Sequence, residues 1–389
     1  MEPRHILLTG GRAPATLDLA RQFARAGHCV VVAESIPLHL CRTSHLVKKC
    51  YQVPPPNAEP AAFIAALEHI IRAEGIDLLI PTCEEVFFVA RGLEQLRELC
   101  CVCASPLAQM RRLHSKWDFV QAARQYGLPV PETHLLTSRA DLHHFCIQRS
   151  SPFVLKPVFS RFATHVHVIE RAEQALCHQL TISPQYPWVA QERIVGQAFS
   201  SYSIAYEGRL LAHTVYPETF TAGQGACIHF QAVEQSAIEQ WVVDFLRHER
   251  FSGQIACDFI VTAAGTVYPL ECNPRATSGV HLFGASNELN EAFFNARATA
   301  DTLKPRPGTR AMLGLAMLFC GLPTIRSIKQ FRRWARLFFG SRDVLFALDD
   351  PIPFFAQTFV LGYNWLESRR RRISIAEFTT RDIEWNGQQ

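Results

Sequence analysis

The chain has 389 residues, of which 48% are hydrophobic and 19% are charged. This balance is typical of a globular protein and excludes a largely disordered one, and the length allows two or three packed units. The formal net charge of +4 is too small to indicate nucleic-acid binding. The thirteen cysteines form no pair of CxxC motifs, so they indicate neither a zinc site nor a disulfide framework. A strand is predicted almost directly after Met1, where a signal peptide would lie, so we expect a cytoplasmic protein.

The first hundred residues alternate between short apolar strands and helices. The predicted strands and helices are His5–Thr9, Ala15–Ala26, Cys29–Ala33, Pro60–Glu74, Asp77–Pro81 and Glu84–Leu99, in that order. The first strand enters a helix through Gly10-Gly11, which predicts a Rossmann-like parallel α/β domain. The glycine pattern is incomplete as a dinucleotide fingerprint, but Glu34 ends the second strand, where a ribose-binding acid would lie, so an NAD-binding protein remains an alternative. Thr82, Glu84 and Glu85 follow the carboxyl end of a strand, where open α/β sheets bind ligands.

Two lysines lie where an anionic partner would stabilise them. Lys116 is predicted in the first turn of a helix capped by Ser115, where a cation faces the positive end of the helix dipole. Lys156 lies within the apolar strand Pro152–Pro157, where its charge would lose hydration. A polyphosphate would offset both costs. An exposed Lys116 without a ligand is the alternative.

Strands and a helix follow. A strand is predicted over Trp188–Ile194, and Ser201–Tyr206 with Arg209–Val215 predicts a hairpin. Pro217–Ala226 predicts a mobile loop of the kind that covers active sites. Ala237–Arg250 predicts an amphipathic helix with its apolar face in the core.

A second predicted hairpin carries the clearest functional signal. Two apolar runs flank Ala263-Ala264-Gly265. If Ala264 and Gly265 form a two-residue turn, Asp258 lies directly opposite Glu271, and Asn273 shares the face of Glu271. Carboxylate and carboxamide oxygens suit Mg²⁺, so the hairpin predicts a magnesium site. A surface hairpin with solvated acids is the alternative.

Glu271-Cys272-Asn273-Pro274-Arg275, preceded by Asp258, resembles the closing motif of the ATP-grasp superfamily, especially its carbamoyl-phosphate-synthase-like and carboxylate–amine-ligase branches. The resemblance runs from Lys116 to about Gly284. It implies an α/β (α+β) fold with four parts. These are a Rossmann-like pre-ATP-grasp domain over residues 1–112, an ATP-grasp small lobe over 113–187, a large lobe with the metal site over 188–310, and a C-terminal extension over 311–389.

The resemblance also implies roles for individual residues. Asp258, Glu271 and Asn273 would hold Mg²⁺, or Mn²⁺ in its place, on the phosphates of ATP. Lys116 and Lys156 would bind the phosphates. Arg275 would face the transferred phosphoryl group, and Lys156 and Asn273 would assist it in catalysis. Further contacts to ATP are expected from Ser160, Arg161, Gln191, Glu192, Ile194 and Gln197.

The sequence departs from the family pattern in two places. The family usually has a glycine-rich loop over the phosphates after the matching Lys156, whereas residues 158–165 contain no glycine. We expect Ser160 and Arg161 to supply a hydroxyl and a charge there. The family often has a ribose-binding Glu where this chain has Ala198, so Gln197 is expected to replace it.

The segment Ile325–Arg342 contains six Lys or Arg and no acid, with Ile328, Phe331, Ala335 and Phe338 on one helical face. Such a segment can lie peripherally on an anionic membrane or bind a lipid-like substrate. A packed helix with a solvated basic face is the alternative. The apolar run Ala311–Leu322 is too short to span a bilayer.

These features together predict a ligase that uses ATP to activate a carboxylate as an acyl phosphate and joins it to an amine, releasing ADP and phosphate. The expected partners are a small-molecule carboxylate and amine, no nucleic acid, and a second copy of the chain in a homodimer. The alternatives are a nucleotide-binding protein with a degenerate site, a phosphotransferase on the same scaffold, and the NAD-binding protein.

Overall fold

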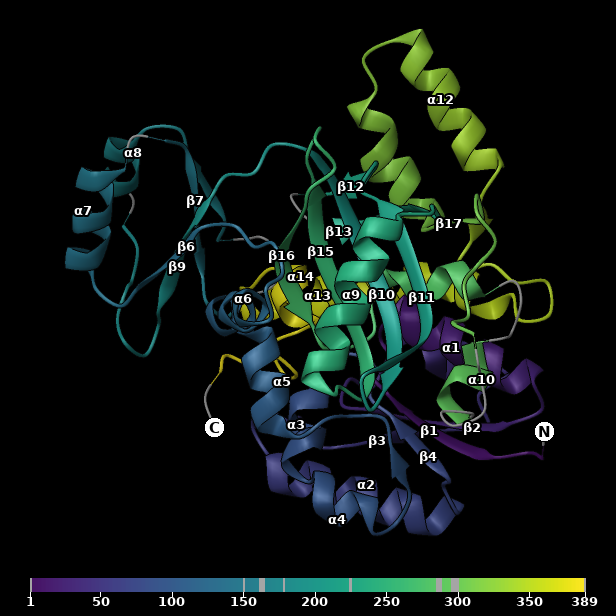
Figure 1. The fold of residues 1–389 in the computed structure, drawn as a ribbon. Helices are drawn as coiled ribbons and strands as arrows, with labels where there is room; N and C mark the ends of the chain where they lie inside the picture. The colour runs from purple at the N-terminus through teal and green to yellow at the C-terminus, as the bar shows by residue number, and fades with distance from the viewer. Residues whose placement is uncertain are drawn as a thin grey trace.

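The structure is a computed structural model that describes residues 2–149, 151–160, 165–177, 179–223, 226–284, 289–294 and 301–387. Figure 1 shows an N-terminal α/β layer at the bottom, a small lobe at the left, a central sheet, and C-terminal helices, of which one projects at the top and the last ones run behind this sheet. The mixed α/β fold and the order of its parts follow the prediction. The exact domain boundaries remain predictions.

The N-terminal layer is a five-stranded parallel sheet in the order β3-β2-β1-β4-β5. Its elements are β1 (His5–Thr9), α1 (Pro14–Arg25), β2 (Cys29–Glu34), β3 (Lys49–Gln52), α2 (Pro60–Glu74), β4 (Leu78–Ile80), α3 (Glu85–Arg91), α4 (Leu93–Arg97) and β5 (Cys101–Val102). The central strands are apolar along their length because helices cover both faces of a parallel sheet.

Two details of this layer differ from the prediction. The helix expected over Glu84–Leu99 is divided into α3 and α4 at Gly92, where Ile64 of α2 packs so closely that a Cβ would lie 2.7 Å from its Cγ2. The edge strands β3 and β5 were not predicted, because both are short and neither has the continuous apolar run of a buried strand.

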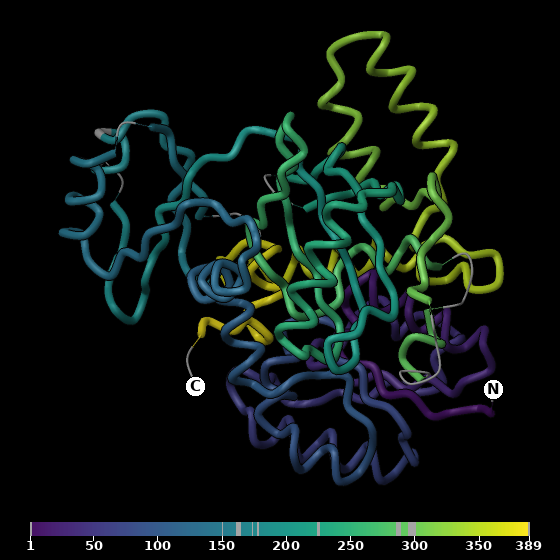
Figure 2. Tube along the Cα trace, in the orientation of Figure 1, coloured from purple at the N-terminus to yellow at the C-terminus, as the bar shows by residue number. Residues whose placement is uncertain are grey.

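Two helices, α5 (Leu107–His114) and α6 (Lys116–Gln125), lead into the small lobe. The lobe is an antiparallel sheet in the order β6-β9-β7-β8 with two helices on it. Its elements are β6 (Thr133–Leu136), α7 (Arg139–Gln148), β7 (Phe153–Pro157), β8 (His167–Ile169), α8 (Ala172–Cys177) and β9 (Trp188–Glu192). It has its own hydrophobic core, and Figure 2 shows it standing apart from the remaining chain.

The large lobe is built on an antiparallel sheet in the order β11-β10-β15-β16. Its elements are β10 (Gln197–Tyr206), β11 (Arg209–Pro217), β12 (Thr221–Ala222), β13 (Ala226–Cys227), β14 (His229–Gln231), α9 (Ser236–Glu249), β15 (Gly253–Val261), β16 (Val267–Asn273), the 3-10 helix η2 (Ser278–Phe283), α10 (Leu289–Phe294) and β17 (Arg310–Met312). As predicted, α9 buries its apolar face, with Trp241 packed edge-on against Phe259 of β15. The loop predicted over Pro217–Ala226 includes β12, which pairs with β13.

The C-terminal residues form helices and one short strand around these lobes. They are α11 (Gly314–Ala316), the π-helical turn η3 (Met317–Gly321), the 3-10 turn η4 (Leu322–Thr324), α12 (Ile328–Phe339), β18 (Arg342–Asp343), α13 (Ile352–Arg371) and α14 (Ile375–Phe378). Within the described ranges, no helix is both long enough and apolar enough to cross a membrane.

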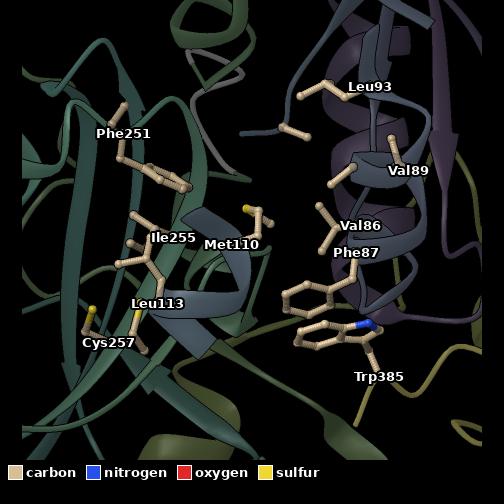
Figure 3. Close-up of a cluster of buried hydrophobic side chains, with 14 of the residues drawn as sticks. Val86, Phe87, Val89, Leu93, Met110, Leu113, Phe251, Ile255, Cys257 and Trp385 are labelled. Carbon is tan, nitrogen blue, oxygen red and sulfur yellow. The ribbon is translucent and has the colours of Figure 1, made fainter. Parts of the chain in front are cut away.

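The last residues return to the N-terminal layer. The indole of Trp385 stacks on Phe87 of α3, with ring centroids 4.5 Å apart and planes at 13°. Figure 3 shows this pair below Val86, with Met110 and Leu113 of α5 beside it and Ile255 of β15 beyond. One hydrophobic core therefore joins the N-terminal layer, α5 and the large lobe.

Buried ion pairs join α1 to later segments. Asp18 accepts hydrogen bonds from His281 Nδ1 at 2.9 Å and Arg342 Nη2 at 2.8 Å. Burial alone would raise the pKa of Asp18, but Arg342 and His281 lower it to about 2. Arg21 is also buried and donates to Asp350 Oδ2 at 2.9 Å.

Candidate active site

The hairpin of β15 and β16 places Asp258 directly opposite Glu271, as predicted. The predicted turn is wrong, because Thr262 pairs with Thr266 around a three-residue loop that ends in Gly265 at φ +82°. This loop shifts the register by one position near the turn. A bulge between Asp258 and Phe259 restores it, because Phe259 pairs with Pro269 and leaves Leu270 as the extra residue.

The bulge also connects the two lobes. Lys156, on β7 of the small lobe, is buried and donates from Nζ to the carbonyl oxygen of Leu270 at 2.9 Å. Burial and repulsion by Lys116 lower the pKa of Lys156 to about 8, against the attraction of Glu271 and Asp258. The lysine of the small lobe thus lies next to the two acids of the large lobe.

Lys116 reaches the same place from the first turn of α6. Its Nζ lies 3.3 Å from Glu271 Oε2 and donates to the carbonyl oxygen of Ser160 at 3.2 Å. The Lys116 side chain is only 3% exposed, so it is not a solvated surface lysine. Glu271 supplies the anionic partner that this unfavourable position on the helix requires.

Asn273 and Arg275 continue the cluster beyond Glu271. Asn273 Nδ2 donates to Glu271 Oε1 at 3.3 Å, and Arg275 Nη2 donates to Asn273 Oδ1 at 3.3 Å. The guanidinium of Arg275 also approaches Glu84 of the N-terminal layer, with Nε and Oε1 4.0 Å apart. Of the six residues expected to act on ATP phosphates and metal, Lys116, Glu271, Asn273 and Arg275 therefore form one continuous set of polar contacts. The other two adjoin this set, because Asp258 lies opposite Glu271 and Lys156 binds the Leu270 carbonyl.

Sequence reasoning missed two members of this site. Ser200 of β10 pairs with Asp258 in the sheet and donates from Oγ to Asp258 Oδ1 at 2.7 Å. The same hydroxyl lies 3.2 Å from Oε1 of Glu218, which follows β11. Ser200 lies just before the predicted strand Ser201–Tyr206 and was therefore not identified, and Glu218 lies in Pro217–Ala226, which we predicted to be a mobile loop.

The two opposed acids of this site have pKa values shifted in opposite directions. Burial and the nearby Glu271 and Glu218 raise the pKa of Asp258 well above its usual range. Burial would also raise the pKa of Glu271, but Lys116 and Lys156 outweigh it and lower this pKa to about 2. A further positive charge close to Asp258 would allow both acids to ionise.

The donor atoms of Asp258, Glu271 and Asn273 are hard oxygens, and they fit a divalent cation such as Mg²⁺. Among the described residues, no group of three or more His, Cys, Asp or Glu is arranged to hold a metal by itself. A cation here would therefore need oxygen atoms from a substrate or water to complete its coordination, which is the usual situation of Mg²⁺ at phosphates.

The other residues expected to contact the nucleotide lie along β9 and at the start of β10. Gln191 is buried in β9 and its side chain donates to Thr133 Oγ1 at 3.0 Å, while the amide of Glu192 donates to the Glu132 carbonyl at 2.8 Å. Ile194 is half-buried between the lobes, and Gln197 is exposed at the start of β10.

The glycine-free loop is described only in part. Ser160 contributes its carbonyl oxygen to Lys116, and Arg161 lies outside the described residues. The contacts of these residues and of β9 to ATP remain predictions.

At the carboxyl edge of the N-terminal sheet, where we expected ligand-binding residues, the acidic side chains form hydrogen bonds with other groups of the protein. Glu85 Oε1 accepts from Thr9 Oγ1 at 2.7 Å and from the amide of Thr82 at 3.0 Å. Glu84 Oε2 accepts from the amide of Trp385 at 3.2 Å. These acids therefore serve the fold, and Glu84 also faces Arg275.

Glu34, the candidate ribose-binding acid, is also bound by another side chain of the protein. Arg12 Nε donates to Glu34 Oε2 at 3.0 Å, and Arg12 Nη2 donates to Asp382 Oδ2 at 2.7 Å. Burial would raise the pKa of Glu34, but Arg12 lowers it to about 2. The tail around Asp382 and Trp385 covers the edge at which a Rossmann domain would bind NAD, which argues against the NAD-binding alternative.

No protein-family model and no curated protein matches this sequence. Solved structures do match the fold. An L-amino acid ligase from Bacillus licheniformis superposes with a TM-score of 0.60 at 16% identity, over 80% of this chain and 79% of that one. The ADP complex of purK, an N5-carboxyaminoimidazole ribonucleotide synthetase, superposes with a TM-score of 0.62 at 14% identity, over 80% of this chain and 81% of that one.

A biotin carboxylase from Campylobacter jejuni gives a TM-score of 0.61 at 12% identity over 78% of this chain and 74% of that one. These proteins are ATP-grasp enzymes, and the likeness extends over most of both chains. The chain therefore has the ATP-grasp fold, as the sequence motif predicted.

Proposed function

We propose that this protein is an ATP-dependent ligase that joins a small-molecule carboxylate to an amine. One observation carries the proposal. Lys156 from the small lobe and Lys116 from α6 lie beside the opposed acids Asp258 and Glu271 of the large lobe. Two lysines with two acids and an amide suit a polyphosphate held with a divalent cation between two lobes.

In the proposed reaction, a carboxylate oxygen of the substrate attacks the γ-phosphorus of ATP, and the bond to the β-phosphate oxygen breaks to release ADP. The nitrogen of the amine then attacks the carbonyl carbon of the acyl phosphate. Phosphate leaves, and the amine nitrogen loses a proton. Positioning and charge neutralisation are the main contributions that a protein makes to such a phosphoryl transfer.

The residues of this chain would divide that work. Lys116 and Lys156 bind the phosphates, and Arg275 stabilises charge on the transferred group. Asp258, Glu271 and Asn273 hold Mg²⁺, with Mn²⁺ as a substitute, and the cation supplies neutralisation of phosphate charge when bound. Ser200 and Glu218 orient Asp258 through the hydroxyl between them.

The comparisons support a nucleotide substrate without identifying the acceptor. The purK structure is an ADP complex, and a 2-oxoglutarate carboxylase domain of the same fold is a dimer in complex with MgADP and bicarbonate. For this chain, ATP, Mg²⁺, a cytoplasmic location and a homodimer are part of the proposal.

The test is ADP release by the purified protein with Mg·ATP and pooled carboxylic acids and amines. Turnover that requires both pools and is lost in Glu271→Gln would support the ligase. ADP release with acids alone would indicate a phosphotransferase. ADP release that Glu271→Gln leaves unchanged would contradict the proposal.

A second candidate is a nucleotide-binding protein without turnover. Residues 158–165 lack the glycines that usually surround phosphates in this fold, and Ala198 replaces the usual ribose acid. Mg·ATP binding with no ADP release from any pool would favour this candidate.

A further inference from the structure

Residues 314–339, which we name the arm, fold as two short helical segments joined by a turn. The first comprises α11, η3 and η4, and the second is α12. Figure 1 shows the arm projecting from the top of the molecule, away from the small lobe and the N-terminal layer, and Figure 2 shows the same outline. Its turn is therefore the part of the arm most distant from the body.

The base of the arm is firmly packed. Trp334 is buried with Met312, Met317 and Ile228 in a separate hydrophobic cluster, and its indole nitrogen donates to the carbonyl oxygen of Met317 at 3.1 Å. Ser327 caps α12 by accepting from the amide of Gln330 at 3.2 Å. The arm is therefore a preformed structure whose apolar face is packed at its base.

Near the turn, the apolar face of the arm is exposed. Phe319 is 74% exposed, Ile328 is 70% exposed and Phe331 is 44% exposed. Leu318 and Leu322 are exposed beside them. Scattered apolar side chains are normal on a surface, but several large ones on one projecting arm indicate a contact surface.

The charged residues around these side chains are all basic. Between Ile325 and Arg342 the chain has no acid, and its basic residues are Arg326, Lys329, Arg332, Arg333, Arg336 and Arg342. In the described part of the chain, only Arg342 of these six forms an ion pair, with Asp18. The other five are available to an anionic partner that also accepts apolar side chains.

We propose that the arm binds the surface of an anionic lipid membrane, with Phe319 and Ile328 in the headgroup–acyl boundary and Lys329 and Arg332 on the headgroups. Apolar anchors surrounded by Lys and Arg are the features by which peripheral proteins bind such surfaces. An acidic protein partner would satisfy the charges but would not require large apolar side chains at a projecting turn. The inference goes beyond the proposed ligase activity and does not depend on it.

The test is flotation of the full chain, without ATP, with vesicles of phosphatidylcholine alone or of phosphatidylcholine and phosphatidylglycerol in equal amounts. We expect binding to the anionic vesicles that weakens at high salt, because salt screens the attraction of the basic residues. Failure to bind the anionic vesicles, or equal binding to both kinds, would overturn the proposal.

Paired variants locate the contact. Phe319→Ser with Ile328→Ser should weaken binding at least about tenfold, because each removes a large apolar anchor. Lys329→Gln with Arg332→Gln should weaken it about 25-fold, since each basic residue near an anionic surface contributes about fivefold. The matched controls are Ile147→Ser, whose side chain is 71% exposed on α7, and Arg247→Gln on α9, and both should bind as the wild type does.

Two further outcomes would refute the assignment to the arm. Phe359 of α13 is 75% exposed. If Phe359→Ser abolished vesicle binding while the Phe319 and Ile328 variant still bound as the wild type does, the contact would lie on α13. A dimer in size-exclusion chromatography that the Phe319 and Ile328 variant converts to a monomer, without vesicle binding, would show that the arm pairs with a second copy. Urea unfolding of each variant checks that the fold is retained.

Discussion

Replacing Trp385 tests whether its packing anchors the C-terminal tail to the N-terminal layer. Its side chain is 3% exposed and stacks on Phe87, with Phe159 edge-on at 5.6 Å. Removing a buried aromatic side chain of this size costs about 3–5 kcal/mol. We therefore expect Trp385→Ala to lower the free energy of unfolding by about 3 kcal/mol, near the lower limit, because a terminal segment can partly detach and spare the remaining fold.

The measurement is urea unfolding followed by circular dichroism. The matched control is Trp365→Ala on α13, where the side chain is 48% exposed, and it should cost less than about 1 kcal/mol. In the described residues the Trp385 indole nitrogen is buried without a hydrogen-bond partner, so Trp385→Phe should cost much less than Trp385→Ala. Equal costs for Trp385→Ala and Trp365→Ala would refute the packing that we describe.

Three further predictions concern the rest of the molecule. Asp18 and Glu34 have pKa values of about 2 in the folded chain, below those of an unfolded chain, so the stability that they supply should be present above about pH 4.5 and should be lost as the pH falls toward 2. Asp18→Asn should flatten this loss in acid-unfolding curves, and an unchanged curve would contradict it. Lys156→Gln should weaken ATP binding by about 10- to 100-fold in calorimetry, as expected for loss of a charged contact, with little change in stability. Gly279→Ala should destabilise the fold by about 1–3 kcal/mol in thermal unfolding, because its Cβ would overlap Tyr202 Cβ, and an unchanged melting temperature would refute the close contact.

The sequence could predict features that depend on local pattern. Strands such as β1 and β2 are continuous apolar runs, and the motif from Glu271 to Arg275 was sufficient to indicate the fold. The pairing of Asp258 with Glu271 was predicted from a wrong turn. The three-residue loop and the bulge at Leu270 compensate each other, and no local pattern revealed either of them.

The features that could not be predicted depend on contacts between distant segments. Arg12 binds Asp382 across 370 positions of the chain, and Trp385 stacks on Phe87. Glu218 reaches Asp258 only through Ser200. A single sequence contains no information on such distances, because periodicity reports a face of one element and not its neighbour.

The central claim is that Lys156, Lys116 and Glu271 converge to hold a nucleotide and a divalent cation. The most direct measurement is calorimetric titration of the full chain with ATP, with and without Mg²⁺, for the wild type, Glu271→Gln and the surface control Glu234→Gln. We predict Mg²⁺-dependent binding to the wild type and the control, weakened at least about tenfold in Glu271→Gln because a ligand of the cation is lost. Absence of ATP binding, or binding that Glu271→Gln leaves unchanged, would contradict the account.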